Sequence, residues 1–290
     1  TTNANLGFQA SYNYQHKYYA DFSVAMPYST KLPTGNRVAF SPTVTLGWNL
    51  ANEKFLENSI FDNLMLTASV GIINQDLDIT ASDNEDGYYL YKTVVQKGGW
   101  YSWGDNGGLA VTEFQRGNNP DMTYVMRNEF TAGLRGSMWS ILINFDINFF
   151  TSKMDGGLGR PGSLYPNYFT QIGYPSSSII PYVNFNVDQR TGFDFSVYAN
   201  KKVGEVDLTL GVSGMYYKST AKKRAENIEF SYLSAVGRAL NGYWGLESEG
   251  FFRDEAEITS APTQTFGDVK PGDIRYKDQN NDGKIGRAHV

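Results

Sequence analysis

Apolar and polar side chains alternate along several segments of the chain with a period of two residues, which is the period of a β-strand. The clearest segment runs from 139 to 149, where every second residue is large and apolar and most of the residues between are polar. Seven other segments show the same alternation. The pattern therefore predicts eight strands, at 6–14, 18–26, 42–50, 64–72, 124–134, 139–149, 193–199 and 206–212.

The connections between the predicted strands alternate between short and long. Short links fall at Gln15 and His16, at 135–138 and around Lys201 and Lys202, whereas the link at 51–63 barely differs in length from the loop before it. Outer-membrane barrels have short periplasmic turns and longer extracellular loops, and their tilted strands need about 9 to 11 residues to cross the bilayer. We therefore expect the long connections to lie outside the cell, at 27–39, 74–123, 151–190 and from 218 onward.

Composition supports a β-rich membrane protein and excludes other classes. The chain has 30 glycines, 20 tyrosines and 18 phenylalanines, whereas charged residues make up 19%. Its mean hydropathy is negative, as expected when lipid-facing and inward-facing residues alternate. A net charge of −5 disfavours a nucleic-acid partner, and the absence of cysteine excludes disulfides. We predict an all-β fold, a partial antiparallel transmembrane β-barrel with long extracellular loops.

Two sequence segments resemble a known family. The first, from Tyr12 to Leu56, contains the residues Lys17, Tyr18, Phe40, Pro42, Gly47, Trp48, Glu53, Phe55 and Leu56. The second is 271–285, which reads PGDIRYKDQNNDGKI. Both are similar to motifs of the SusC/RagA family of TonB-dependent transporters. A further stretch at 243–258, YWGLESEGFFRDEAEI, also looks like the family.

The resemblance implies a fold, a function and a set of partners. It implies that the eight strands are part of a barrel of about 22 strands in the bacterial outer membrane. The implied function is TonB-dependent active uptake of oligosaccharides or peptides. The implied partners are a SusD-like surface lipoprotein, a glycan or peptide substrate and outer-membrane lipid. A TonB complex is also implied, and we expect its contact to lie in N-terminal parts that are missing here.

The predicted organisation has two parts. Residues 1–217 form the partial barrel with its loops, and 218–290 form an extracellular loop segment. The tail at 285–290, IGRAHV, matches what a common sequencing adapter encodes in one reading frame, and we expect it to be an artefact. The start at Thr1, without a signal segment, is expected to reflect processing or truncation.

The second motif contains a candidate calcium site. In a D-x-N-x-D-G loop, oxygen side chains at alternate positions and a sharp glycine turn surround a hard cation. The twelfth position, normally a bidentate carboxylate, is His289. An Asx-rich turn without metal is the alternative, equally favoured by this composition. The candidate ligands are Asp278, Asn280, Asp282 and the Lys284 carbonyl.

The longest loop contains candidate substrate-binding residues. Exposed aromatic faces suit the binding of a sugar or a peptide, although aromatic residues in a loop more often pack on one another. The candidates are Tyr89, Trp100, Tyr101 and Trp103.

The sequence contains no recognisable catalytic set, and we expect no enzyme. Its two histidines, His16 and His289, lie in a turn and in the suspect tail. Inward-facing charged residues suit a polar barrel lumen; they are Arg127, Glu129, Asp146, Asp194 and Asp207. Two alternative functions stay open: a passive or structural outer-membrane barrel, and a soluble secreted carbohydrate-binding β protein.

Overall fold

The computed structural model describes residues 2–77, 79, 89–104, 106–170, 178–228, 234–279 and 281–286. These residues form two compact units, 1–225 and 226–290. The first unit ends eight residues beyond the predicted boundary at 217, because the last long strand continues to Lys223. No helix in the described part of the chain is long and apolar enough to cross a membrane.

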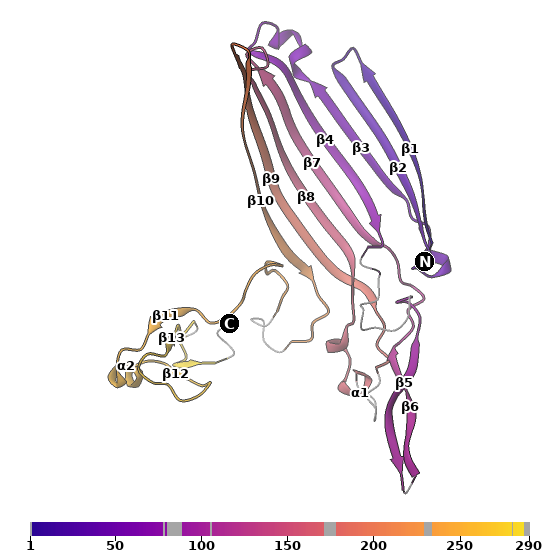
Figure 1. Cartoon of the computed structure of the whole chain (residues 1–290), viewed down its shortest axis with the longest axis vertical. Coiled ribbons are helices and arrows are strands. Elements are labelled where there is room, and N and C mark those ends of the chain that lie inside the picture. Colours follow the sequence, from indigo (N-terminus) through magenta and orange to yellow (C-terminus); the bar gives the residue numbers. More distant parts are fainter. Residues whose placement is uncertain are drawn as a thin grey trace. The chain divides into compact units, whose positions relative to one another are not determined.

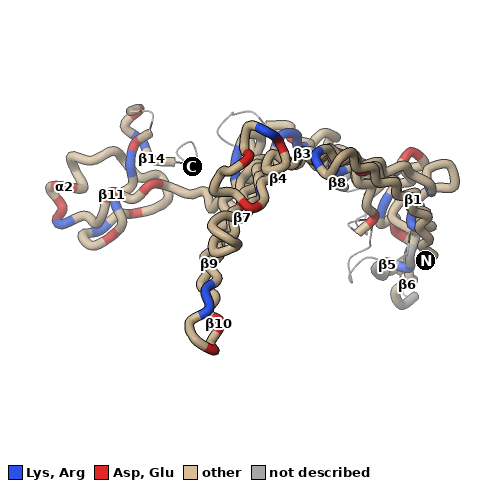
Figure 2. The backbone as a smooth tube through the Cα atoms, turned by 90° about the horizontal axis from the view of Figure 1, so that it is seen from above, with Lys and Arg blue, Asp and Glu red and all other residues tan. Residues whose placement is uncertain are grey.

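An antiparallel sheet of eight strands dominates the first unit (Figure 1). All eight predicted strands are present, in the order β1-β2-β3-β4-β7-β8-β9-β10. Figure 2 views the sheet end-on and shows the strands in a curved row. The strands are β1 Asn3–Tyr14, β2 Tyr18–Ser29, β3 Ser41–Asn49, β4 Phe61–Gln75, β7 Val125–Met138, β8 Ile143–Gly159, β9 Val183–Val203 and β10 Val206–Lys223.

The short connections lie at one end of the sheet and the long ones at the other (Figure 1). The β1–β2 turn holds Gln15 and His16 in left-handed conformations (φ 53° and 54°), as a tight hairpin turn requires. The β3–β4 link contains short 3₁₀ helices at Leu50–Asn52 and Lys54–Leu56. We call this the short-turn end, and the opposite one the loop end.

The turn between β7 and β8 differs from its predicted place. The link predicted at 135–138 is strand, and the chain reverses at 139–142 instead. Trp139, Ser140 and Ile141 all have positive φ, between 56° and 66°. The Ile141 N–H donates to the Asp62 carboxylate (2.9 Å), and this bond holds the turn. Alternation misplaced the turn because Trp139 and Ile141 continue the apolar period through it.

The strands also extend further at the loop end than their apolar pattern predicts. β8 continues to Gly159 and β9 begins at Val183, so the connection predicted at 151–190 spans 160–182. Beyond Phe149 the side chains on the apolar face become polar, for example at Thr151 and Lys153. The backbone pairing continues because strand hydrogen bonds do not depend on apolar side chains.

The predicted loop at 74–123 contains a second, two-stranded sheet. β5 (Val94–Trp103) and β6 (Asn106–Arg116) form an antiparallel hairpin with several register shifts. Short helices occur at Thr34–Asn36 in the β2–β3 loop, and at Gly162–Leu164 and Asn167–Thr170 (α1) in the β8–β9 loop.

The second unit is small and held by ion pairs. Its helix α2 (Glu255–Ser260) begins at Asp254, whose carboxylate accepts the Glu257 N–H (2.9 Å). Arg275 pairs with Glu257 (2.5 Å) and Glu249 (3.4 Å). Its strands are β11 Ser248–Phe251, paired with β13 Ile274–Tyr276, and β12 Thr263–Gln264, paired with β14 Lys284–Ile285.

Candidate functional site

The sheet has one apolar and one polar face. Residues directly paired across strands project to the same side. Ala68, for example, pairs with Leu46 and with Ala132, and the row continues to Phe149. The apolar face is widely exposed in the described chain; its exposed members include Leu6, Phe8, Phe22, Leu46, Val70, Ile147, Phe193, Leu210 and Val212. We call it the outer face, because lipid-facing surfaces of barrels are apolar.

The inner face carries a hydrogen-bonded polar cluster across β7, β8 and β9. Arg135 pairs with Asp146 (2.6 Å), and the Asn148 amide donates to both Asp146 (2.7 Å) and Asp194 (2.9 Å). Asn148 thus joins the two carboxylates, which the sequence marked as inward-facing. This arrangement can line a water-filled path and bind polar solutes.

A second inner-face pair lies nearer the loop end. Arg127 pairs with Glu129 (3.0 Å) and also donates to the Ser152 hydroxyl (3.1 Å). Asp207, the remaining charged residue predicted to face inward, lies opposite Lys202 at the short-turn end of β10. The structure therefore brings four of the five predicted charged residues into two clusters, and Asp207 into neither.

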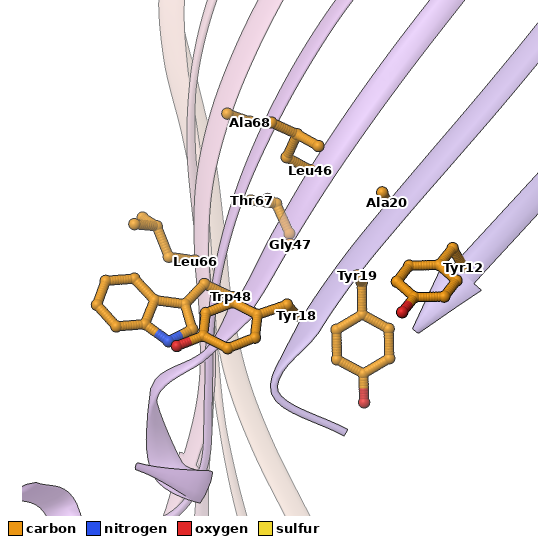
Figure 3. A pocket seen from close by; sticks show the side chains of 10 residues that line it. All are labelled: Tyr12, Tyr18, Tyr19, Ala20, Leu46, Gly47, Trp48, Leu66, Thr67 and Ala68. Carbon is orange, nitrogen blue, oxygen red and sulfur yellow. The ribbon is translucent and has the colours of Figure 1, made fainter. Parts of the chain in front are cut away.

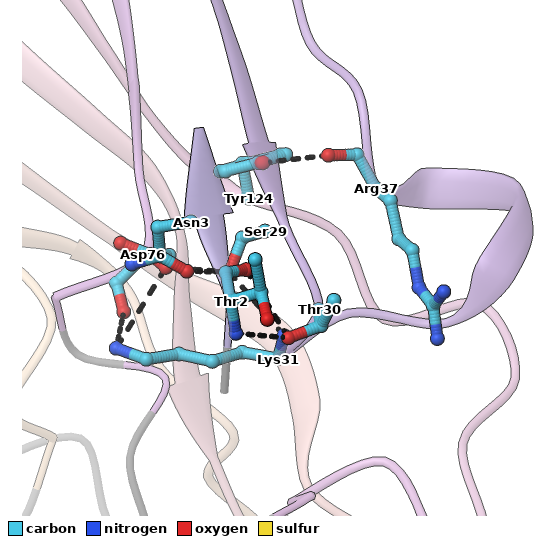
Figure 4. A network of polar contacts seen from close by, with 8 residues as sticks. All are labelled: Thr2, Asn3, Ser29, Thr30, Lys31, Arg37, Asp76 and Tyr124. Atoms are coloured by element: carbon cyan, nitrogen blue, oxygen red, sulfur yellow. Dashed lines mark hydrogen bonds and ion pairs between the residues drawn. The ribbon is translucent and has the colours of Figure 1, made fainter. Parts of the chain in front are cut away.

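A polar network at the loop end ties together the ends of three strands (Figure 4). The Asp76 carboxylate, just after β4, accepts the Ser29 hydroxyl at the end of β2 (2.6 Å). Lys31 donates to the Asp76 carbonyl (3.0 Å), and Ser29 also bonds with Asn3 of β1 (3.2 Å). These bonds fix the strand ends from which the loops start.

The loops have a small hydrophobic core of their own, formed by Leu32, Ile79, Leu90, Met122 and Tyr124. Tyr124 donates its hydroxyl to the Arg37 carbonyl (2.8 Å; Figure 4). Burial, and secondarily the charge of Asp76, raises the pKa of Tyr124 to about 12. Tyr124 therefore stays a neutral hydrogen-bond donor at physiological pH.

Two arginines that the sequence did not single out hold the base of the β5–β6 hairpin. Arg116 is 2% exposed and donates to the carbonyls of Lys92 (3.1 Å) and Tyr89 (3.2 Å). Arg160 donates to the Gln115 carbonyl (2.7 Å), which links the β8–β9 loop to the hairpin. Arginine is usually exposed, and nothing in the sequence around Arg116 indicates that this one is buried.

The residues of the first family-like motif meet at the short-turn end. Glu53 accepts hydrogen bonds from the Lys17 ammonium (2.9 Å), the Tyr18 hydroxyl (2.9 Å) and the Trp48 indole N–H (3.1 Å). The Trp48 ring stacks on Tyr18 (6.3 Å between centroids) and contacts the edge of Phe55 (6.4 Å). We call these five residues the Glu53 cluster. It joins β2, β3 and the β3–β4 link.

The Glu53 cluster predicts a pH dependence of stability. The hydrogen bond from Lys17, and then those from Trp48 and Tyr18, hold the pKa of Glu53 below its ordinary value. The resulting stabilisation is present above the unfolded pKa of about 4.3 and is lost as pH falls through the lower folded pKa. We expect Glu53→Gln to lower the melting temperature of the full-length barrel at pH 7. As the pH falls from about 4.3 through the folded pKa of Glu53, the melting temperature of the variant should fall less than that of the wild type.

The melting temperature of the full-length protein is measured at several pH values between 3 and 7, with unfolding detected by the change in gel mobility. Glu57→Gln, an exposed residue of the same link, is the matched control. Equal pH profiles for Glu53→Gln and the wild type would contradict the role given to this carboxylate.

The candidate substrate-binding aromatics are only partly within the described structure. Tyr89 is half-buried beside Tyr91 (5.8 Å between ring centroids), with the Lys92 ammonium 5.0 Å from its ring. Its contacts are therefore those of loop packing. Trp100, Tyr101 and Trp103 belong to the backbone of β5, but their side chains lie outside the described residues.

The candidate calcium loop is likewise partly described. The Asp278 carboxylate accepts the N–H groups of Asn281 (2.8 Å) and Gly283 (2.8 Å), and Asp282 accepts that of Lys284 (2.8 Å). Asn280 and 287–290, which include the twelfth position, lie outside the described residues. Within the described part of the chain, no three His, Cys, Asp or Glu side chains gather into a possible metal site.

Comparisons with known proteins agree on the class of the chain. No model of a known protein family matches it. It is 22% identical over 302 residues to TonB-dependent receptor P3 of Formosa agariphila, covering 97% of this chain and 28% of that protein. The chain therefore spans less than a third of this relative.

Solved structures of RagAB have the same fold. The RagAB peptide importer in its closed-closed state matches 99% of this chain and 29% of its own, with a TM-score of 0.67 and 16% identity. A second RagAB peptide transporter structure matches 77% of this chain and 22% of its own, with a TM-score of 0.58 and 19% identity. The strands, the motifs and these relatives agree: the chain resembles part of the barrel of a SusC/RagA-like TonB-dependent transporter, a class of protein of the bacterial outer membrane.

Proposed function

We propose that the full-length protein takes up oligosaccharides or peptides across the outer membrane, using energy delivered through TonB. The observation that carries the proposal is the two-faced sheet. Its outer face suits lipid, and its inner face bears the hydrogen-bonded Arg135, Asp146, Asn148 and Asp194. Polar oligomers carry many hydrogen-bonding groups, which such a surface can match as they pass.

The loop end is the proposed place of substrate and partner contact. The loops are anchored by the Asp76 network and by Arg116, so they offer a preformed surface. We propose that a SusD-like surface lipoprotein binds there, and that Tyr89, Trp100, Tyr101 and Trp103 contribute to substrate binding. The relatives support this proposal through their names, which refer to a TonB-dependent receptor and to peptide transport.

Uptake by cells that express the full-length gene tests the function. Fluorescent oligosaccharide and peptide pools are supplied separately, with and without a protonophore that removes the energy source. We expect one of the two pools to accumulate, and the protonophore to abolish its accumulation. Equal uptake with and without the protonophore would identify a passive barrel instead.

We also propose that the 278–284 loop binds calcium. Gly283 has a φ of +77°, which fits the sharp glycine turn of a calcium loop. We expect calorimetry on the full-length protein to detect binding at micromolar to millimolar Ca²⁺, and Asp278→Asn with Asp282→Asn to remove it. An unchanged heat signal in the double variant, or none in the wild type at millimolar Ca²⁺, would leave an Asx-rich turn.

A further inference from the structure

The outer face of β2, β3 and β4 contains an open cavity near the short-turn end (Figure 3). Its volume is about 450 Å³. It crosses three neighbouring strands at the same level, because Tyr18 pairs with Trp48 and Ala20 pairs with Leu46. The lining residues are Tyr12, Tyr18, Tyr19, Ala20, Leu46, Gly47, Trp48, Leu66, Thr67 and Ala68.

Differences in side-chain size create the cavity. Ala20 and Ala68 lie on either side of Leu46 in one cross-strand row, so the surface is low at both positions. The larger rings of Tyr18 and Trp48 project from the same face next to the row of Ala20, Leu46 and Ala68. The two rings stack with an interplanar angle of 19°. Small residues next to large ones therefore leave a depression that is open to the outer side.

The cavity presents apolar surface to its contents. The polar atoms of Tyr18 and Trp48 are already used, since both donate to the Glu53 carboxylate. The other outer-face side chains of the lining are those of Tyr12, Ala20, Leu46, Leu66 and Ala68, which are apolar apart from the Tyr12 hydroxyl (Figure 3). A water molecule needs two to four polar partners, so the cavity favours a hydrocarbon occupant.

Its position in the membrane indicates which hydrocarbon. Aromatic residues of barrels gather where hydrocarbon meets the polar headgroups. Here the Lys17–Glu53 ion pair lies on the turn side of the two rings, and alternating apolar residues lie on the other. The cavity is therefore just inside the hydrocarbon layer at the short-turn end, which in outer-membrane barrels faces the periplasm.

We propose that this cavity binds one acyl chain of a phospholipid from the periplasmic leaflet as a retained ligand. An acyl chain is an unbranched apolar rod that can enter a shallow groove beside two flat rings while its headgroup stays at the level of Lys17 and Glu53. The bound lipid covers the outer surface of β2, β3 and β4 next to the Glu53 cluster.

Native mass spectrometry of the full-length protein in detergent, supplied with phosphatidylethanolamine, tests the site. We expect the wild type to retain one phospholipid after detergent exchange. Ala68→Leu fills the floor of the cavity and should weaken retention about tenfold, the result of losing roughly one buried side chain's apolar contact. Ala199→Leu, an outer-face alanine of β9 outside the cavity, should retain the lipid like the wild type.

Folding is checked by heat-modifiable gel migration, and Ala20→Leu serves if Ala68→Leu does not fold. Equal retention by the cavity variants and the wild type would overturn the proposal. Equal loss in Ala199→Leu would also overturn it, because that result indicates non-specific surrounding lipid. The lipid measurement needs no transport, so its outcome is independent of the uptake experiment.

Discussion

Val212→Arg is expected to destabilise the full-length barrel in a lipid bilayer by about 2 to 4 kcal/mol, the cost of an arginine at the bilayer midplane on the lipid side of a barrel. Val212 projects from the outer face of β10, beside Val197 of β9, and is 60% exposed in the described chain. No polar partner is available to a guanidinium in hydrocarbon, so the residue must draw water or headgroups inward. Urea unfolding in phospholipid vesicles measures the change.

The adjacent residue supplies a matched control. Ser213 pairs with Ser196 and projects to the inner face, so Ser213→Arg introduces the same side chain on the opposite side of the same strand. We expect its effect to stay within about 0.5 kcal/mol, as for an exposed polar position. Equal destabilisation by the two variants would show that the assignment of the faces is wrong.

Arg116→Met is expected to unfold the base of the β5–β6 hairpin locally while leaving the eight-stranded sheet intact. The substitution removes the donor to the carbonyls of Tyr89 and Lys92, at a site where Arg116 is almost fully buried. A buried carbonyl without a donor costs about 1 to 3 kcal/mol, so the loss of both bonds costs at most roughly 2 to 6 kcal/mol. Hydrogen exchange of the amides in 89–116 measures the loss.

Lys92→Met is the control for this loop. Lys92 is exposed, and its ammonium lies 5.0 Å from the Tyr89 ring. An exposed cation–π contact contributes about 0.5 to 1 kcal/mol, so exchange should increase only slightly. Unchanged exchange in Arg116→Met would mean that other contacts hold the hairpin base.

Alternation in the sequence was sufficient to find the eight strands and their two faces. The strands present one face that suits lipid and one that suits water, and this pair of environments produces the period of two that marks them in the sequence. The same signal failed at 139–142, where Trp139 and Ile141 continue the period through a left-handed turn. Turn position there depends on the pairing of β4 with β7, which residue periodicity does not report.

The β5–β6 hairpin was not predicted, for a related reason. Its strands, VVQKGGWYSW and NGGLAVTEFQR, do not alternate regularly between apolar and polar residues. The Glu53 cluster was predicted in part. The sequence identified all five members as motif residues, whereas their contacts depend on the β2–β3 register and on the 3₁₀ helices of the β3–β4 link. Side-chain contacts of this kind follow from register, not from composition.

The extension of β8 and β9 past Phe149 has a consequence for access from outside. From Thr151 to Gly159 the strand rises by roughly 20 Å along the membrane normal, given about 3.3 Å per residue and a tilt near 45°. The outer side of this extension carries polar residues such as Lys153 and Gln189, which suit water or lipid headgroups and not hydrocarbon. The sheet therefore continues past its apolar band as a polar wall, which would raise the loop end above the hydrocarbon layer of a membrane.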